Sequence, residues 1–231
     1  MLKAAAVFAV AIVALLCSVT GAPAIAIYSD AGGDGVGTLS CQSGLVGCGG
    51  VANITAPAGP WQPNNPGGTN AVWISFDANH GSVGPNVLSP DLSDANHTVN
   101  FSYDFNLAIA STLTLSVWAD DTAHISLDHA HLYNGNAVQD GACAAGPLGC
   151  QPGEQFSIAP VLLAAGNHEL DFEVFQRVIF DNGDGTPFGL MFAGDLTPVP
   201  EPGTILLLGS ALTAAGMASR RRLLKKKGTD S

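Results

Sequence analysis

Basic residues are almost missing from the middle of the chain. Between residues 27 and 200 there is one, Arg177, against fourteen Asp and three Glu. Such a surface repels nucleic acid, because nucleic-acid binding needs clustered Lys and Arg to replace counterions. We therefore exclude a nucleic-acid partner. The acidic charge suits the binding of cations or neutral sugars, although it also serves simply to keep an exported protein soluble.

Helical periodicity and serine-hydrolase motifs are also missing. No segment between residues 27 and 197 has the hydrophobic period of a helix, and the chain contains no Gly-x-Ser-x-Gly sequence. Instead, apolar and polar residues alternate over 97–107, 111–120 and 168–175, and less regularly over 71–78. This alternation is typical of half-buried antiparallel strands. We expect an all-β antiparallel β-sandwich or jelly roll over residues 71–197, with 27–70 as its turn-rich N-terminal part.

Neither end of the chain has a hydrophobic run long enough to span a membrane. Near the N-terminus a basic residue precedes an apolar stretch from Ala4 to Leu16, and an A-x-A sequence follows. This is the pattern of a secretory signal peptide, which implies a helix within 1–26 and the secretion translocon and signal peptidase as partners. We place cleavage after Ala26, with Ala24 and Ala26 as the small residues. Cys17 raises a lipoprotein alternative, but the residue before it is larger than lipidation normally accepts.

The C-terminus has three parts in a fixed order. Pro200, Glu201 and Pro202 come first, then an apolar run from Ile205 to Ala218, then a basic cluster formed by Arg220, Arg221 and Arg222. As a helix the apolar run would extend about 21 Å, less than the ~30 Å hydrocarbon core of a membrane. Proline fixes its own backbone and restricts its predecessor, so the first part is extended and accessible to a protease.

This order of parts resembles the PEP-CTERM sorting signal over residues 198–231. The family's tails are recognised by exosortase, a membrane-embedded cysteine enzyme of Gram-negative bacteria. The resemblance implies transient insertion of the short apolar helix in the inner membrane, removal of the tail, and a final location at the cell surface or outside the cell. An ordinary single-pass membrane anchor is the alternative.

Four cysteines follow the signal peptide, and they form two pairs with six residues inside each pair. In an exported chain this spacing predicts two local disulfides, Cys41–Cys48 and Cys143–Cys150. Zinc ligands normally lie two to four residues apart, which disfavours a zinc site. The sequence alone allows three pairings.

Residues 113–135, 160–176 and 186–194 carry a second resemblance, to galactose-binding-like β-sandwiches and the protective-antigen-type lectin module. In calcium-dependent lectins of that type an adjacent Asp pair binds calcium, and Asp120 and Asp121 match it. Asp181 and Asp184 could supply further hard oxygen ligands. The four aspartates are equally suited to lie hydrated at the surface or to form turns by bonding their own backbone. His129 and His131 form an H-x-H pair that can bind zinc, but the turn expected there would point the two rings apart.

Together these features predict an exported, exosortase-processed surface, matrix or biofilm protein that binds exopolysaccharide or another glycan and is not an enzyme. A purely structural matrix protein is the first alternative. A secreted glycan hydrolase is the second, because Glu169, Asp171 and Glu173 alternate along one strand face and hydrolases use paired carboxylates. Acids that alternate in this way are, however, the ordinary solvent side of a strand.

Overall fold

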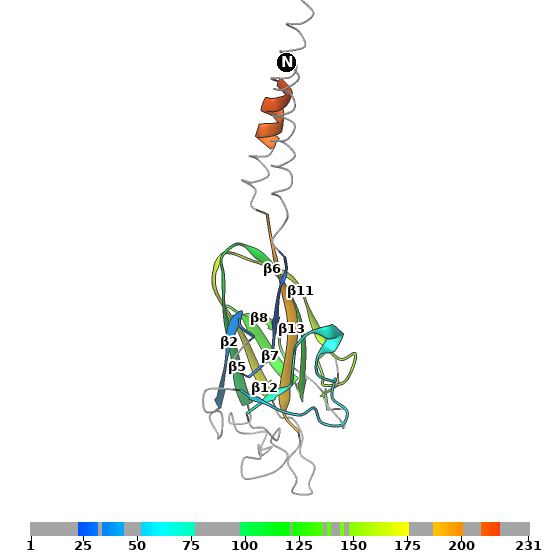
Figure 1. Ribbon diagram of the computed structural model, residues 1–231. Helices are drawn as coiled ribbons and strands as arrows, with labels where there is room; N and C mark the ends of the chain where they lie inside the picture. The colour runs from blue at the N-terminus through cyan, green and yellow to red at the C-terminus, as the bar shows by residue number, and fades with distance from the viewer. Residues whose placement is uncertain are drawn as a thin grey trace, which may run out of the picture. The chain divides into compact units, whose positions relative to one another are not determined.

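Two antiparallel sheets make up the body of the protein and confirm the predicted all-β sandwich (Figure 1). The computed structural model describes residues 23–31, 34–43, 52–76, 98–120, 122–135, 138–139, 144–145, 148–175, 187–200 and 209–217. A further pair of short strands, β9 (Val138–Gln139) and β10 (Ala144–Ala145), forms a separate two-stranded ribbon.

The first large sheet, sheet B, has five strands in the order β2-β5-β12-β7-β8. They are β2 (Gly37–Ser43), β5 (Thr98–Leu107), β12 (Gly166–Phe175), β7 (Thr122–Leu127) and β8 (Ala130–Tyr133). Strand β12 lies at the centre and pairs with β5 on one side and β7 on the other. The alternating sequences of 98–107 and 168–175 therefore form strands, as their pattern predicts, and the structure shows that the two strands are adjacent.

The second large sheet, sheet A, has six strands. The path β11-β6-β13-β4-β3 contains β11 (Phe156–Leu163), β6 (Ser111–Asp120), β13 (Gly189–Pro198), β4 (Ile74–Ser75) and β3 (Asn53–Ile54). The sixth strand, β1 (Ile25–Tyr28), pairs with β13. Of the strand expected over 71–78, the structure describes residues 71–76, and within these Ile74–Ser75 pairs as a strand. Trp73 packs in a cluster outside the sheet, and Val72 donates its N–H to the carbonyl of Ser29.

The core lies between the two sheets and is built from the inward residues of the alternating strands. Phe172 of sheet B stacks on Phe192 of sheet A with ring centroids 5.0 Å apart, and Tyr103 meets the same ring edge-on at 5.4 Å. All three side chains are fully buried. Because the two sheets bury these side chains between them, aromatic and aliphatic residues occupy one side of each strand and produce the alternation in the sequence.

A second apolar cluster covers the other side of sheet A. Trp61 and Trp73 lie with ring centroids 4.1 Å apart, and Trp118 and Met191 pack in the same cluster. The loop that carries Trp61 and Trp73 contains one 3-10 turn, Pro66–Gly68. All three tryptophans are buried in this cluster on sheet A, whereas the outward residues of sheet B are mostly polar.

The contacts divide the chain into the sandwich, Pro23–Thr197, and a unit made of Met1–Ala22 and Pro198–Ser231. Residues 209–217 of the second unit are helical, within the apolar run for which a short helix is predicted. Among the residues that the structure describes, no helix is both long and apolar enough to cross a membrane. The predicted signal-peptide helix lies outside the described residues.

Candidate functional site

The outer face of sheet B is a continuous polar surface, which we call the polar face. Strand register sets Asp104 opposite Glu169, and Ser102 opposite Asp171. On the other side of β12, Asp171 lies opposite Ser126 and Glu173 opposite His124. Because side chains alternate across a strand, these residues all point away from the core.

A hollow of about 400 Å³ lies on the polar face. Every residue that lines it is polar, and the set comes from four adjacent strands: Asn100, Ser102, His124, Ser126, His131, Glu169, Asp171 and Glu173. Ser102 donates its hydroxyl to Asp171 Oδ1 at 2.7 Å, and Gly135 donates its N–H to His124 Nδ1 at 3.0 Å. The hollow therefore combines fixed acceptors with hydroxyl and amide groups that both donate and accept.

The turn between β7 and β8 is bonded to β12 beside this hollow. Asp128 donates its N–H to the carbonyl of Glu169 at 2.9 Å, and its Oδ1 accepts the Glu169 N–H at 3.0 Å. Asp128 and His129 both have a positive φ, 50° and 64°, as the two central residues of a tight hairpin turn. The sequence places a tight turn here but does not reveal that Asp128 fastens the turn to a neighbouring strand.

His168 completes the attachment of this turn. Its Nδ1 lies 2.8 Å from Asp128 Oδ2 and its Nε2 lies 2.9 Å from the carbonyl oxygen of Ala164. Both oxygens are acceptors, so the doubly protonated ring fits the site best. Partial burial acts to lower the pKa of His168. The hydrogen bond with Asp128, the hydrogen bond with the Ala164 carbonyl and the charge of Asp128 together outweigh burial, so the net pKa is raised. The pKa of Asp128 is lowered, because its bonds to His168 and to the Glu169 N–H outweigh its own partial burial.

Glu169 lies among other carboxylates on the polar face. Partial burial raises its pKa, and the carboxylates of Asp171 and Asp104 raise it further. The cause is the register, which brings these like charges to the centre of the sheet. Among the described residues of the sandwich there is no Lys or Arg to offset them.

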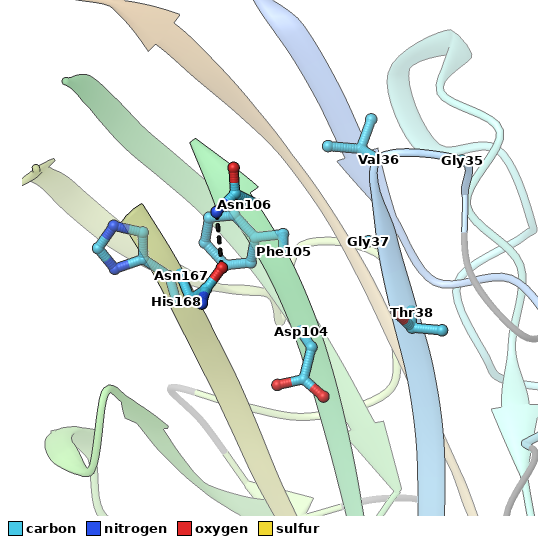
Figure 2. A pocket seen from close by; sticks show the side chains of 9 residues that line it. All are labelled: Gly35, Val36, Gly37, Thr38, Asp104, Phe105, Asn106, Asn167 and His168. Atoms are coloured by element: carbon cyan, nitrogen blue, oxygen red, sulfur yellow. Dashed lines mark hydrogen bonds between the residues drawn. The ribbon is translucent and has the colours of Figure 1, made fainter. Parts of the chain in front are cut away.

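A second hollow, of about 610 Å³, lies where β2 begins, β5 ends and β12 begins (Figure 2). Thr38 and Asp104 contribute polar groups, and Asn106 donates its side-chain N–H to Asn167 Oδ1 at 2.6 Å. Asp104 borders this hollow and faces Glu169, so the two hollows adjoin on sheet B.

A third hollow, of about 430 Å³, lies against sheet A beside Trp118. Trp118 is 5% exposed, and its indole N–H has no hydrogen-bond partner among the described residues. Thr114, Ser116 and Asp195 also line this hollow. It is the competing location for any ligand of the sandwich.

Asp120, predicted as a calcium ligand, lies under the tryptophan cluster and not at an open rim. It is 3% exposed, and its Oδ2 accepts the indole N–H of Trp61 at 2.5 Å. Asp121, Asp181 and Asp184 lie outside the described residues. Calcium binding by these four residues stays a prediction, with Asp120 already engaged in a buried hydrogen bond.

The predicted disulfides and cleavage sites are only partly within the described residues. Cys41 and Cys150 are both buried and disulfide-bonded, whereas Cys48 and Cys143 fall outside the described part, so the pairing stays a prediction. Ala24 and Ala26 are described, and Ala26 lies inside β1, where it pairs with Asp195. The cut predicted after Ala26 would therefore remove half of the four-residue strand β1.

Comparison with known proteins identifies the tail. Residues 198–222 match the family described as the PEP-CTERM protein-sorting motif. The matched segment contains Pro200, Glu201, Pro202 and Arg220 to Arg222. This motif supports export of the chain and its processing by exosortase. Of these residues only Pro200 is described, just after β13 ends at Pro198.

Comparison with curated proteins and solved structures adds a match too weak to interpret. None of the curated proteins compared with the chain is a match. The crystal structure of the GH31 alpha-xylosidase from Xanthomonas citri is similar over 50% of this chain, at 6% identity and a TM-score of 0.21. The matched region spans 13% of that enzyme. A likeness this weak supports no statement about fold type or activity.

Proposed function

We propose that the processed protein resides at the cell surface or in the extracellular matrix and binds polysaccharide through the polar face of sheet B. One observation carries this proposal: the hollow of about 400 Å³ is lined entirely by polar side chains from four neighbouring strands. Neighbouring strands lie about 4.8 Å apart, and residues i and i+2 about 6.7 Å apart. The face is therefore a grid of donors and acceptors that can hydrogen-bond the hydroxyl groups of several sugar units at once.

The charge of the face selects the class of sugar. Asp104, Glu169, Asp171 and Glu173 all lie on this face of β5 and β12, with no Lys or Arg among its described residues. Uronate-rich or sulfated polysaccharides would be repelled, whereas carboxylates accept hydrogen bonds from neutral sugars and attract amino sugars. The preferred ligand is a neutral or amino-bearing polysaccharide.

We propose binding without hydrolysis. Glycosidases hold their two carboxyl groups about 5–5.5 Å apart when they retain configuration and about 6.5–9.5 Å apart when they invert it. Glu169 and Asp171 project from the same strand two residues apart, with oxygen atoms within 4.8 Å of each other. Both carboxylates project outward from one strand, as acids on the solvent side of a strand ordinarily do, and we assign them to ligand binding.

A glycan array probed with the processed protein tests this function. We expect binding to neutral or amino-bearing polymers and none to uronates. Because the contacts are mostly hydrogen bonds, binding of neutral polymers should change little between low and physiological salt, whereas binding of amino-bearing ones should weaken. An array with no signal, or a preference for acidic polymers, would contradict the proposal and favour a purely structural matrix role. Release of soluble sugar would instead favour the hydrolase.

A further inference from the structure

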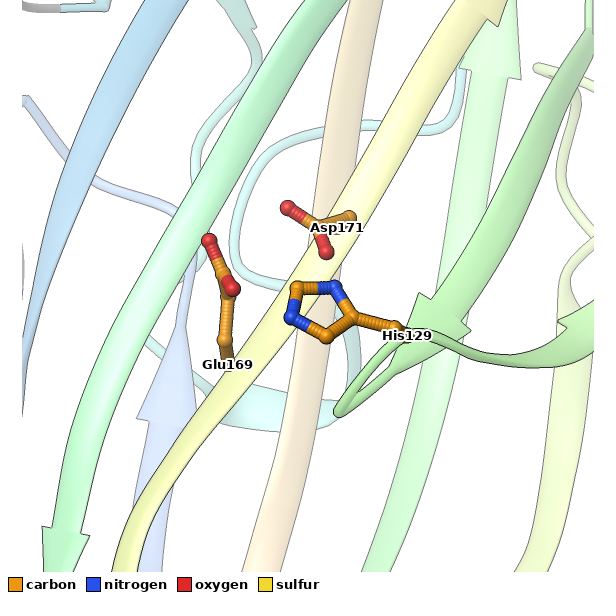
Figure 3. A group of neighbouring side chains, drawn as sticks. All are labelled: His129, Glu169 and Asp171. Atoms are coloured by element: carbon orange, nitrogen blue, oxygen red, sulfur yellow. The ribbon is translucent and has the colours of Figure 1, made fainter.

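One imidazole and two carboxylates converge on the polar face. Ligating atoms of His129, Glu169 and Asp171 all lie within 4.8 Å of one another, and Figure 3 shows the three side chains pointing toward a common centre. We propose that this group binds a first-row divalent cation, with Zn²⁺ as the best match. The inference goes beyond glycan binding and does not depend on it.

The three residues come from two elements that are bonded together. Glu169 and Asp171 are two residues apart on β12, so both point outward from the polar face, and His129 belongs to the turn between β7 and β8. The neighbour of His129, Asp128, exchanges two hydrogen bonds with the backbone of Glu169, at 2.9 and 3.0 Å. The turn and one ligand are therefore held in fixed register before any ion binds, which lowers the cost of assembling a site.

A bound cation would also relieve a charge conflict. Glu169 lies between Asp171, on its own strand, and Asp104, directly opposite on β5. Between residues 27 and 200 the sequence offers Arg177 as its single basic residue, and Arg177 lies outside the described part. A divalent ion shared by both acids would offset the repulsion.

A supporting hydrogen bond orients one ligand. Ser102 donates its hydroxyl to Asp171 Oδ1 at 2.7 Å, which fixes the orientation of that carboxylate. Hydrogen bonds of this kind, made to the ligands of a metal, hold them in place.

The mixed donor set decides which ion fits. Zinc accepts imidazole nitrogen and carboxylate oxygen together, and three protein ligands leave a fourth position for water. Calcium prefers six to eight oxygen ligands, which one imidazole and two carboxylates do not supply. The site should therefore prefer zinc to calcium.

The test is isothermal titration of chelator-treated processed protein with zinc chloride, with the melting temperature as a second readout. We expect about one ion per chain and a rise in melting temperature, since the ion binds the folded state. His129→Gly should weaken zinc binding at least tenfold, because it removes the imidazole. It creates an Asp-Gly turn, which suits the positive φ of both positions, so the hairpin should survive.

His131→Ala is the matched control, measured for zinc alone. His131 lies two residues further along on β8 and lies outside the convergent group. Its loss should leave zinc affinity unchanged, while Asp171→Asn should weaken binding as His129→Gly does. Three results would each overturn the inference: no zinc binding, equal losses in the His129 and His131 variants, or displacement of zinc by an equal concentration of calcium. Because the titration contains no glycan, its failure is distinguishable from failure of the glycan array.

Discussion

Asp34 connects the two sheets, and its replacement by alanine should destabilise the sandwich strongly. Its carboxylate accepts three backbone N–H groups, from Tyr28 at 2.7 Å, Val36 at 2.8 Å and Gly37 at 3.0 Å. It also accepts the hydroxyl of the fully buried Tyr103 at 2.8 Å. Tyr28 lies in sheet A, whereas Gly37 and Tyr103 lie in sheet B. Burial and the hydrogen bond to Asp34 raise the pKa of Tyr103.

The size of the effect follows from what each variant leaves unpaired. Asp34→Ala leaves a buried phenol and three backbone donors without their acceptor. A hydrogen bond to a charged group contributes roughly 1.5–3 kcal/mol, but water can replace the partner of the donors near the surface, so the net loss should be about 3 kcal/mol. Tyr103→Phe removes the donor together with its bond and leaves the carboxylate with three N–H partners. Its cost should be about 1 kcal/mol.

Urea unfolding of the processed protein at neutral pH measures both losses. The two variants should differ by about 2 kcal/mol in the free energy of unfolding, with Asp34→Ala the weaker protein. In the double variant the losses should not add, because the two residues share a bond. A loss below about 1 kcal/mol for Asp34→Ala, or additive losses in the double variant, would refute the assignment of Asp34 as the connection between the sheets.

Two further predictions concern processing and pH. Intact mass and N-terminal sequencing of the protein from its native host should show no residues from the tail beyond the neighbourhood of Pro202. The N-terminus should be near Ile25, two residues before the start that a cut after Ala26 would give, because Ile25 and Ala26 pair with Leu196 and Asp195 in the folded sheet. A tail that still carries Arg220 to Arg222 would contradict processing by exosortase. The raised pKa of His168 predicts that the wild-type protein has a larger free energy of unfolding than His168→Gln, by about 1 kcal/mol, at low pH. The difference should be complete below the ordinary histidine pKa of about 6.5 and should disappear as the pH rises through the higher pKa of the folded state. Urea unfolding that gives the same difference between the two proteins at pH 5.5 and pH 9 would contradict it.

The strands of sheet B were predictable because burial on one side of a strand leaves a direct mark on the sequence. Phe101, Tyr103 and Phe105 alternate with polar residues, and in the structure they face the core while their neighbours form the polar face. The segment 71–78 was less predictable. Trp73 interrupts the alternation because it belongs to the cluster on the far side of sheet A. Within residues 71–76, the described part of this segment, two residues pair as a strand.

Neither the contacts of Asp34 nor those of the candidate site were predictable from local sequence. Asp34 lies in a stretch rich in glycine and aspartate, where such residues ordinarily form turns. Its role depends on Tyr103, which is 69 residues away in the sequence. The convergence of His129 with Glu169 likewise depends on strand order, because β7 and β12 are neighbours in space although four other strands separate them in the chain. Sequence alternation identifies which face a residue occupies but not which strand lies next to it.

The most direct test of glycan binding by the polar face compares two charge-neutralising variants on opposite sheets. Glu173→Gln removes one carboxylate from the polar face, and Asp195→Asn removes one from the hollow on sheet A. The affinity of each processed variant is measured for the polymer that binds best on the array. We predict at least tenfold weaker binding for Glu173→Gln and unchanged binding for Asp195→Asn. Weaker binding for Asp195→Asn with unchanged affinity for Glu173→Gln would place the ligand beside Trp118 and contradict the account.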